Sequence, residues 1–487
     1  MPKASIIGAG IGGIATAIRL AVKGYSVEVF EANDYPGGKL TEIQQDGFRF
    51  DAGPSLLTMP QYIDELFRLA GKDPSRFFSY QRLYIICKYF YEDGSRITAY
   101  ADEEKFINKV NQITGEGKAL RQYIYKSSRI YELTNQIFLQ RSLDQPKTFF
   151  TWDAFKSLLH FGEIDTFRTM HQANNQFFTD KRLQQYADRY ATYNGSNPYQ
   201  APATLNVIPH LEQHFGAYFP KGGMYQITNC LVELAKSLGV KFRYRSKVDE
   251  IVLRDKKAVG IKVNGAIIDA DIVISNMDVW FTYHKLLVQY PKYQPKKILS
   301  QERSSSALIF YWGIKKQFPE LDLHNIFFSS DYKAEFEYMW KKQTIYHDPT
   351  VYINITSKFK PDDAPPDCEN WFVMINVPAN KGQNWDKFIA DARGNIIKKL
   401  SRILQVGIAE LIVSESILDP RSIESRTSSY QGSIYGTSSN SRYAAFLRHA
   451  NRSSKIKNLY FCGGSVHPGG GIPLCLLSAK IVSELIG

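Results

Sequence analysis

The sequence predicts an α/β fold in which a parallel sheet is assembled from distant parts of one chain. Three observations predict it: a strand–turn–helix–strand pattern at the N-terminus, a second glycine-rich turn near the middle, and a strand, turn and helix at the C-terminus. Short apolar runs supply the expected strands, at residues 3–7, 25–30, 240–244, 271–275 and 458–462. Runs of this length and composition are typical of strands buried in a parallel sheet.

The N-terminal pattern carries a glycine motif. Gly8, Gly10 and Gly13 fit G-x-G-x-x-G between the first strand and an expected helix over residues 14–22, and Glu31 ends the second strand. In such a unit the glycines permit a tight turn, close approach of a pyrophosphate and close helix–strand packing. The helix N-terminus faces the phosphates, and the acidic residue accepts hydrogen bonds from the ribose. The motif therefore predicts a Rossmann-like dinucleotide-binding unit.

A second glycine pair indicates which dinucleotide is bound. Gly37, Gly38 and Lys39 follow the acidic residue almost at once. An NAD site does not need this extra turn with its cation, whereas a longer cofactor that extends across the domain does. The sequence predicts FAD.

The net charge is +12, from 60 Lys and Arg against 48 Asp and Glu. Such a balance suits nucleic acid or an anionic membrane surface. There is no zinc-finger spacing, no RNA-binding aromatic motif and no dense basic run, so we expect neither a nucleic-acid partner nor a metal site.

The cysteines indicate a reducing compartment. They are odd in number and scattered, at Cys87, Cys230, Cys368, Cys462 and Cys475, which is unlike a disulfide framework. The chain enters a strand at once, which leaves no room for a signal peptide, and no run approaches 18 uninterrupted apolar residues. We expect a cytoplasmic protein that associates peripherally with a membrane.

The chain divides into two expected domains. Residues 1–80, 220–290 and 415–487 form the discontinuous FAD-binding domain, and residues 81–219 and 291–414 form a mixed α+β substrate domain. Residues 102–190 are helical in pattern and rich in Phe and Tyr with interspersed basic residues. This segment has two interpretations: ordinary core and surface, or a face that rests on anionic lipid and admits an apolar substrate.

Five motifs together resemble one family. The segments GAGIGG, EANDYPGGKL, FDAGPSLL, FPKGGM and LYFCGGSVHPGGGIPLCLLSAKIV resemble those of the bacterial and fungal type carotenoid desaturases, which include phytoene desaturase, and the resemblance spans the whole chain. The loop DRYATYNGSNPYQAP at residues 188–202 looks most like the hydroxycarotenoid 3,4-desaturase branch. Phytoene desaturase, a carotenoid or retinoid saturase, an amine oxidase and a non-enzymatic prenyl-chain carrier are the alternatives.

The resemblance implies an FAD enzyme that introduces a C=C bond into an acyclic or monocyclic carotenoid, most simply by 3,4-desaturation of a 1-hydroxycarotenoid. Flavin N5 takes a hydride from one carbon, and a proton leaves its neighbour. The implied partners are a hydrophobic polyene, a membrane surface, and oxygen or a quinone as electron acceptor. No catalytic base is assigned: His467 stands in the C-terminal glycine-rich loop, where a histidine that satisfies loop backbone is the simpler interpretation.

The resemblance also implies the cofactor contacts. Those toward the phosphates and adenosine are Gly8, Gly10, Gly12, Gly13, Glu31, Gly38, Lys39 and Val248. Those toward the flavin ring are Ser55, Leu56, Gly463, Gly464, Gly471 and Ile472. Asn276, which ends the buried strand, is a further implied contact. A helix that begins near Gly471 would present its N-terminus to the ring. Ser465 departs from the family pattern and is a further polar contact in this interpretation.

Overall fold

The computed structural model describes residues 1–441, 443 and 447–487. Its first layer is a parallel sheet with the strand order β19-β13-β1-β2-β9. The strands are β1 (Lys3–Ile7), β2 (Ser26–Phe30), β9 (Lys241–Arg243), β13 (Ile272–Ser275) and β19 (Leu459–Phe461). The predicted parallel sheet is therefore present, and each strand falls within its predicted run.

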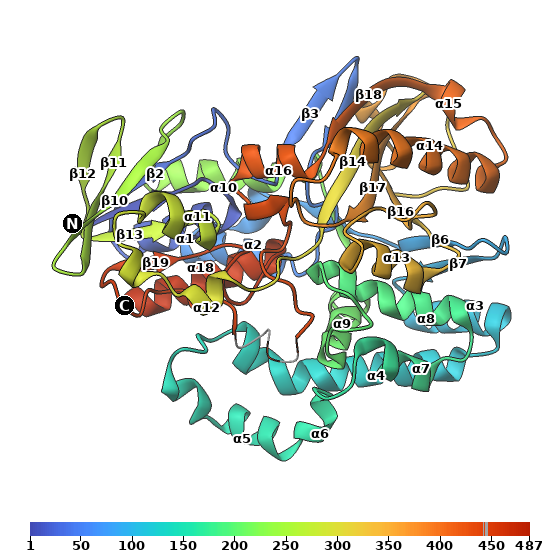
Figure 1. Cartoon of the computed structure of the whole chain (residues 1–487), viewed down its shortest axis with the longest axis horizontal. Helices are drawn as coiled ribbons and strands as arrows, with labels where there is room; N and C mark the ends of the chain where they lie inside the picture. Colours follow the sequence, from blue (N-terminus) through green and yellow to red (C-terminus); the bar gives the residue numbers. More distant parts are fainter. Residues whose placement is uncertain (442, 444–446) are drawn as a thin grey trace.

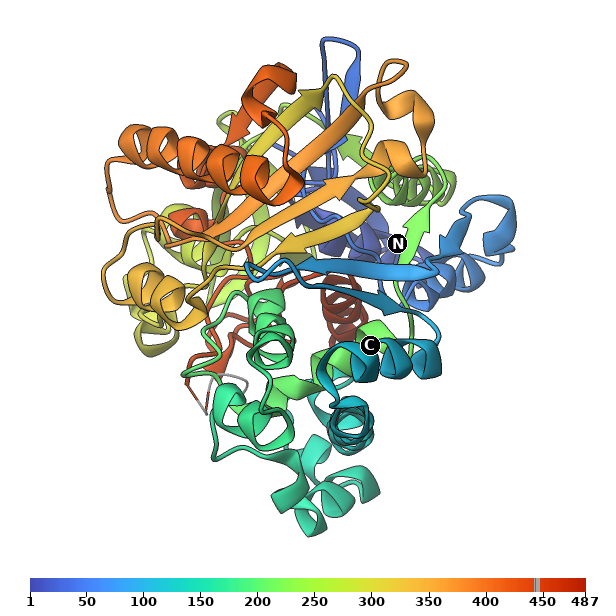
Figure 2. The ribbon, with the colours of Figure 1, turned by 90° about the vertical axis from the view of Figure 1, so that its right-hand side faces the viewer.

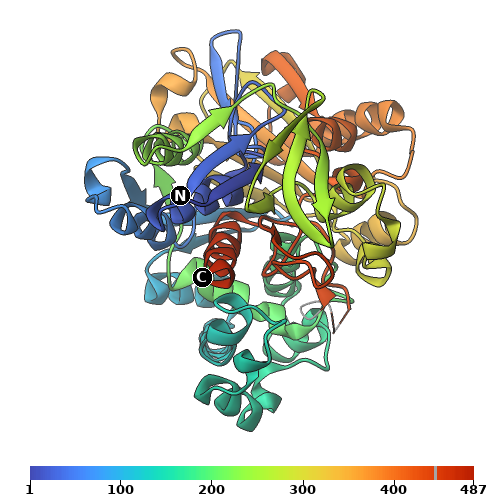
Figure 3. The same cartoon turned by 90° about the vertical axis from the view of Figure 1, so that its left-hand side faces the viewer.

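Alternate side chains of this sheet enter different cores. Ile6, Val29 and Ile274 pack with the helices α1 (Ile11–Val22), α10 (Gln226–Ser237) and α18 (Ile472–Ile486). Ile7 and Val273 pack on the other face, against the meander of β10 (Val248–Arg254), β11 (Lys257–Val263) and β12 (Ala266–Asp269), which crosses the front of Figure 3. Because both faces are covered, the central strands β1 and β13 are buried on both sides after Lys3.

A second sheet stands beside the first, with the order β18-β14-β17-β16-β15-β6-β7, and Figure 2 shows it nearly face-on. Neighbouring strands are antiparallel except β15 and β6, which are parallel. The strands are β6 (Ile85–Phe90), β7 (Arg96–Tyr100), β14 (Ser306–Ile314), β15 (His324–Phe327), β16 (Val351–Ile355), β17 (Glu369–Val377) and β18 (Ile412–Leu418). The β18 strand crosses the boundary at residue 414, and the exact domain division stays a prediction.

The second sheet also uses its two faces differently. Leu308, Phe310, Val373 and Ile375 pack against α14 (Trp385–Leu404). The intervening residues of β14 and β17 belong to another core, shared with the hairpin of β3 (Glu42–Gln45) and β4 (Phe48–Asp51). That second face looks toward the parallel sheet.

A helical layer occupies the lower part of Figure 1. It contains α3 (Glu103–Thr114), α4 (Gly117–Thr134), α5 (Trp152–Leu159), α6 (Phe161–Ile164), α7 (Met170–Phe177), α8 (Lys181–Asp188) and α9 (Ile208–Gln213). The chain enters and leaves through the paired strands β5 (Tyr80–Arg82) and β8 (Tyr218–Pro220). The remaining short helices are α2 (Gln61–Leu69), α11 (Val279–Phe281), α12 (Lys296–Leu299), α13 (Tyr332–Trp340), α15 (Ile408–Leu411) and α16 (Pro420–Thr427). In the described part of the chain, no helix is long and apolar enough to cross a bilayer.

Candidate functional site

One large cavity lies between the carboxyl ends of the parallel strands and the second sheet. Its empty volume is about 3160 Å³, a figure that includes space open to solvent. Open α/β sheets bind their ligands at this strand end. The lining comes from both sheets, so a ligand in the cavity would contact both.

The cavity collects most of the residues that the sequence singled out. Fourteen of the fifteen predicted contacts line it: Gly8, Gly10, Gly12, Glu31, Gly38, Lys39, Ser55, Leu56, Val248, Asn276, Gly463, Gly464, Gly471 and Ile472. Gly13 does not line it and lies buried in the first turn of α1. The structure therefore brings residues from both ends and the middle of the chain to one site, and their individual contacts to a cofactor stay predictions.

Both glycine-rich turns close on the side chain of Asn276. A Cβ at Gly10 would lie 2.6 Å from Asn276 Oδ1, and one at Gly463 would lie 2.5 Å from Asn276 Nδ2. Asn276 Nδ2 donates to the carbonyl of Cys462 at 3.2 Å, and the Asn276 backbone N–H donates to Ile7 at 2.8 Å. Gly10 is thus required by the protein's own packing as well as by any approaching phosphate.

Gly13 has a different neighbour. A Cβ there would lie 2.3 Å from the carbonyl oxygen of Gly8, well inside van der Waals contact. Gly8 itself has φ +94°, which glycine adopts without the strain that a Cβ brings. The helix can therefore pack on the turn only because residue 13 has no side chain.

The Glu31 carboxylate holds the first turn in place. Its Oε2 accepts from the N–H of Ala9 at 2.7 Å, and its Oε1 accepts from the backbone and side chain of Asn33 at 2.9 and 3.0 Å. Each carboxylate oxygen has further acceptor capacity. Glu31 can thus order the glycine turn and still accept from a ribose hydroxyl.

Two helices direct their N-termini at the cavity. Helix α1 begins after Gly10 and α18 after Gly471, and neither has a side-chain cap or an acidic residue in its first turn. The first-turn N–H groups of a helix have no partner within the helix and attract negative charge. The cavity consequently offers two separate places for anionic groups.

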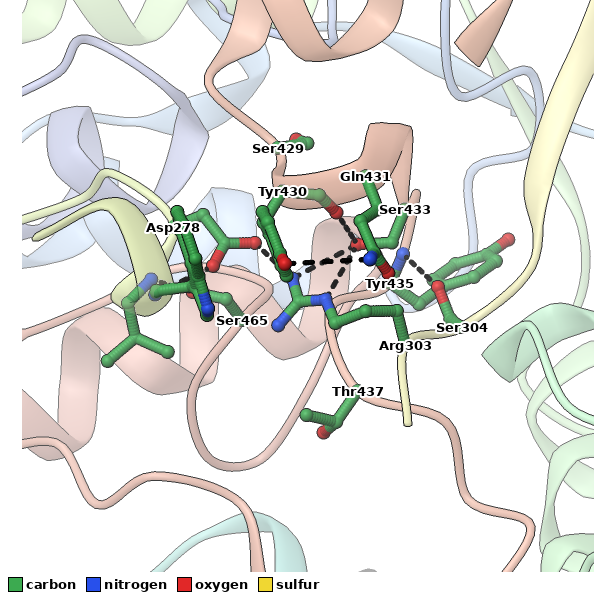
Figure 4. Close-up of polar contacts among 12 residues, drawn as sticks. Asp278, Arg303, Ser304, Ser429, Tyr430, Gln431, Ser433, Tyr435, Thr437 and Ser465 are labelled. Carbon is green, nitrogen blue, oxygen red and sulfur yellow. Dashed lines mark hydrogen bonds and ion pairs between the residues drawn. The ribbon is translucent and has the colours of Figure 1, made fainter. Parts of the chain in front are cut away.

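A buried polar cluster closes one wall, shown in Figure 4. Asp278 pairs with Arg303, and both side chains are almost fully buried. Arg303 also donates to Ser433 Oγ at 3.0 and 3.2 Å, and the ring of Tyr430 stacks on Trp280 at 3.7 Å. The cluster fastens the segment around Ser433 to the start of β14.

Lys39 extends from the glycine pair to the same segment. Its Nζ donates to the carbonyls of Ser433 and Ile434 at 3.4 and 3.2 Å. Burial lowers the pKa of Lys39, and the nearby Asp278 carboxylate opposes that shift. Lys39 thus places a cation in the cavity wall, where the sequence predicted it beside phosphates and the ribityl chain.

Two residues of the C-terminal loop serve the protein itself. Ser465 Oγ accepts from the N–H of Val279 at 3.0 Å, which accounts for the serine in place of the usual residue. His467 Nε2 bonds the carbonyl of Arg141 at 2.9 Å and is not among the residues that line the cavity. Burial lowers the pKa of His467 to about 4. His467 therefore hydrogen-bonds loop backbone, which agrees with the simpler of its two interpretations.

Comparison with known proteins identifies the family. Residues 11–487 match the profile of the flavin containing amine oxidoreductases. The chain belongs to this family. It is 51% identical over 487 residues to the 1-hydroxycarotenoid 3,4-desaturase of Flavobacterium sp. (strain P99-3), covering 100% of this chain and 99% of the relative. It is 35% identical over 492 residues to the 4,4'-diapolycopene oxygenase of Methylomonas sp., covering 99% and 97%.

The fold of the flavoprotein also matches solved structures. An oxidoreductase from Methanosarcina mazei superimposes with a TM-score of 0.64 at 15% identity, covering 99% of this chain and 100% of that one. At this identity the match shows the shared fold. The resemblance to carotenoid desaturases and the predicted FAD cofactor are both confirmed by the family and its relatives.

The site fits the FAD of this family at both ends. The α1 N-terminus, with Glu31 behind it, suits a pyrophosphate and ribose. The α18 N-terminus suits a ring that becomes anionic on reduction. The glycine turns bring backbone to the cavity floor, with the Asn276 carboxamide between them. These residues would hold the cofactor.

Sequence reasoning missed the opposite wall of the flavoprotein's cavity. Arg189, Glu212, His324 and Tyr352 line it, although they are far apart in the chain. Arg189 stands in the loop at residues 188–202 that resembles the hydroxycarotenoid branch. The others carry no local signal: His324 and Tyr352 meet through the pairing of β15 with β16, and Glu212 comes from α9.

Replacing Gly13 by Ala is expected to reduce the flavin bound per chain. The new Cβ would push the helix away from the Gly8 carbonyl, and overpacking of this kind costs about 1–3 kcal/mol. Flavin content follows from the absorbance ratio of the purified protein, and stability from denaturant unfolding. Gly394→Ala is the matched control, since Gly394 lies inside α14 with no atom near its Cβ position. It should retain flavin and gain about 0.5–1 kcal/mol, and a Gly13→Ala protein with full flavin and stability would contradict the account.

Proposed function

We propose that this chain is an FAD-dependent carotenoid desaturase that introduces the 3,4 double bond of a 1-hydroxycarotenoid. The observation that carries the proposal is the single cavity that joins the cofactor turns to an extended apolar wall. The full-length relative at 51% identity, a 1-hydroxycarotenoid 3,4-desaturase, supports the same assignment. The name of the more distant relative, a 4,4'-diapolycopene oxygenase, indicates that it acts on a related class of polyene.

The apolar wall follows from the strand period of the second sheet. Ala307 and Ile309 of β14 face the cavity, as do Phe372 and Met374 of β17. The residues between them enter the opposite core. A polyene is long, rigid and apolar, so a groove of alternating side chains along two strands would bind it without demanding polar contacts.

The loop at residues 188–202 supports the hydroxylated substrate. Arg189, Thr192 and Tyr193 from this loop line the cavity. They place polar groups in the same cavity as the apolar side chains of β14 and β17. A substrate with one polar end and a long apolar body matches that distribution.

The chain's own residues act mainly by positioning. Bound flavin would accept the hydride at N5, as flavins do. The apolar wall would exclude water and align the substrate's C–H bond, and alignment of this kind supplies much of the rate in such reactions. The N-terminus of α18 would stabilise negative charge that develops at the ring. The electron acceptor that completes the cycle is proposed to be oxygen or a quinone.

The direct test supplies the purified yellow protein with a 1-hydroxylated acyclic carotenoid and, separately, with phytoene, both in liposomes. We expect the hydroxylated substrate to lose two hydrogens by mass and to show a red-shifted spectrum, with phytoene unchanged. Conversion of phytoene instead would contradict the 3,4-desaturase assignment, and products that gain oxygen would indicate an oxygenase. Repeating the assay without oxygen, with and without a quinone, identifies the electron acceptor.

We also propose that the protein works in the cytoplasm with residues 149–167 against a lipid surface. Large apolar side chains are strongly exposed there: Phe150 by 87%, Trp152 by 74%, Leu158 by 71% and Phe167 by 74%. Lys156 on α5 is exposed among them. The segment has Lys156 against Asp153, Glu163 and Asp165, so its exposed apolar groups, and not its charge, support an interfacial position. The proposed substrate is insoluble in water, and a surface that lies against the membrane would let it enter the protein from the lipid.

The double variant Phe150→Ser/Trp152→Ser is expected to bind vesicles of phosphatidylcholine and phosphatidylglycerol at least about 10-fold more weakly, because burying each such side chain contributes about 1.5–3 kcal/mol. Co-sedimentation measures the partitioning. Ile267→Ser/Val288→Ser is the matched control, since those side chains are 61% and 60% exposed outside this segment. Equal loss in both double variants, or a wild type that stays in the supernatant, would contradict the proposal.

A further inference from the structure

A chain of hydrogen bonds crosses the cavity wall opposite the glycine turns. Ser55 Oγ and Tyr352 Oη lie 2.7 Å apart, and Tyr352 Oη lies 2.8 Å from His324 Nδ1. All three residues line the cavity. The chain links the turn after β4, which the sequence predicts to lie beside the flavin ring, to a histidine on β15.

The neighbours of His324 determine where its ring proton lies. Asn354 Nδ2 donates to the carbonyl of Leu323 at 3.0 Å, which identifies that atom as the amide nitrogen, since a carbonyl can only accept. The same nitrogen lies 3.3 Å from His324 Nδ1, so Nδ1 is an acceptor. A neutral imidazole then carries its proton on Nε2.

The Nε2–H of His324 lacks a partner within the described chain. The atom is buried and has no hydrogen-bond partner, and the residue as a whole is 4% exposed. Buried polar groups in folded proteins are nearly always hydrogen-bonded, and an exception requires an explanation. Because His324 lines the cavity, a ligand there that brings an acceptor oxygen would supply the missing partner.

Burial, assisted by the nearby Arg189 cation, keeps this histidine neutral. Arg189 and Glu212 pair at 2.7 Å, and both are buried in the same wall. Burial, with a smaller contribution from the Arg189 cation, lowers the pKa of His324 to about 3. The ring consequently offers one N–H and no positive charge, which suits an uncharged oxygen better than a carboxylate or phosphate.

We infer that His324 Nε2–H donates a hydrogen bond to the terminal hydroxyl of the substrate and so selects hydroxylated over unhydroxylated polyenes. The inference rests on the proposed function and names the residue that sets its specificity. Tyr352 is a positioning residue, because its hydroxyl holds the ring of His324 through Nδ1. Ser55 anchors Tyr352 in turn.

The position of the site agrees with the chemistry. In a 1-hydroxycarotenoid that is oxidised between carbons 3 and 4, the hydroxyl-bearing carbon is two bonds from the nearer reacting carbon. A hydroxyl site must therefore lie close to the flavin ring, not at the far end of a long tunnel. The Ser55–Tyr352–His324 chain begins at the turn predicted beside that ring and satisfies this requirement.

The preference for hydroxylated polyenes follows from the unpaired Nε2–H donor of His324. A hydroxyl that accepts from Nε2–H restores the hydrogen bond, whereas a hydrocarbon end leaves the N–H buried and unpaired. Sites built to hydrogen-bond a substrate hydroxyl discriminate strongly against analogues that lack it. Replacing the histidine by an apolar ring should remove that penalty.

The test measures kcat/KM for a 1-hydroxylated acyclic carotenoid and for the same polyene without the hydroxyl, in wild type and in variants that retain flavin. In His324→Phe we expect the ratio of the two values to fall at least about 10-fold. His324→Gln, which keeps an amide donor, should restore part of the ratio. Tyr352→Phe should lower the ratio by a smaller factor, because the ring loses its support but keeps its N–H.

His449→Phe is the matched control. His449 is also buried, at 5% exposure, but it bonds Tyr283 and Ala450 and lies outside the cavity lining. Its replacement should change both kcat/KM values together and leave the ratio intact. Equal loss for both substrates in His324→Phe, or an unchanged ratio, would overturn the inference.

A binding measurement separates this inference from the proposed function. The dissociation constants of both polyenes are obtained from the shift of polyene absorption on titration with protein. If wild type binds the hydroxylated polyene more tightly and His324→Phe does not, the inference holds even where neither polyene is oxidised, and the proposed reaction alone is wrong. If wild type oxidises polyenes but binds and converts both equally, the inference alone is wrong. If His324→Phe does not fold, the ratios in His324→Gln and Tyr352→Phe decide in the same way.

Discussion

The packing of two distant glycine turns around Asn276 is the constraint on which the rest of the site depends. Its carboxamide lies where a side chain at Gly10 or Gly463 would have to be. The strand that carries it sits between β1 and β19, so the same residue closes the N-terminal and C-terminal parts of the chain on each other. Loss of either turn would open the floor of the cavity and separate the α1 and α18 helix ends.

The two sheets supply complementary halves of one site. The parallel sheet ends in turns without side chains and in helix N-termini, which suit the phosphates and ring of a flavin. The other sheet presents alternate apolar side chains, which suit a polyene. Hydride transfer needs the reacting carbon held against the cofactor with water excluded, and a cavity shared between these surfaces provides that arrangement.

The sequence predicted the parallel sheet and the cofactor half of the site well. Glycine spacing, strand–turn–helix order and Glu31 are local signals, and the structure places these residues together. Asn276 could be named as a contact, but its role as the packing partner of both turns needs the fold. Gly13 was predicted to let the helix lie close to the strand, which the structure shows, and its predicted contact to the pyrophosphate stays a prediction.

The substrate half could not be predicted in the same way. His324, Tyr352 and Ser55 lie on two strands and a turn, and long-range pairing alone joins them. A membrane-facing surface spread over residues 102–190 was too broad an expectation, because many aromatic rings of that segment, such as those of Tyr123 and Tyr186, lie in the hydrophobic core. The strongly exposed apolar side chains of this segment lie in residues 149–167. The helical spacing of apolar residues in the sequence does not distinguish those exposed rings from the buried ones.

The central claim is that the cavity places a polyene directly against the flavin. The most direct measurement is the visible absorbance of the purified protein's flavin, recorded without oxygen as a 1-hydroxylated carotenoid is added. The account predicts that the flavin band bleaches in step with the appearance of a product that has lost two hydrogens, one product per flavin. A flavin that stays oxidised while the carotenoid is bound would contradict it.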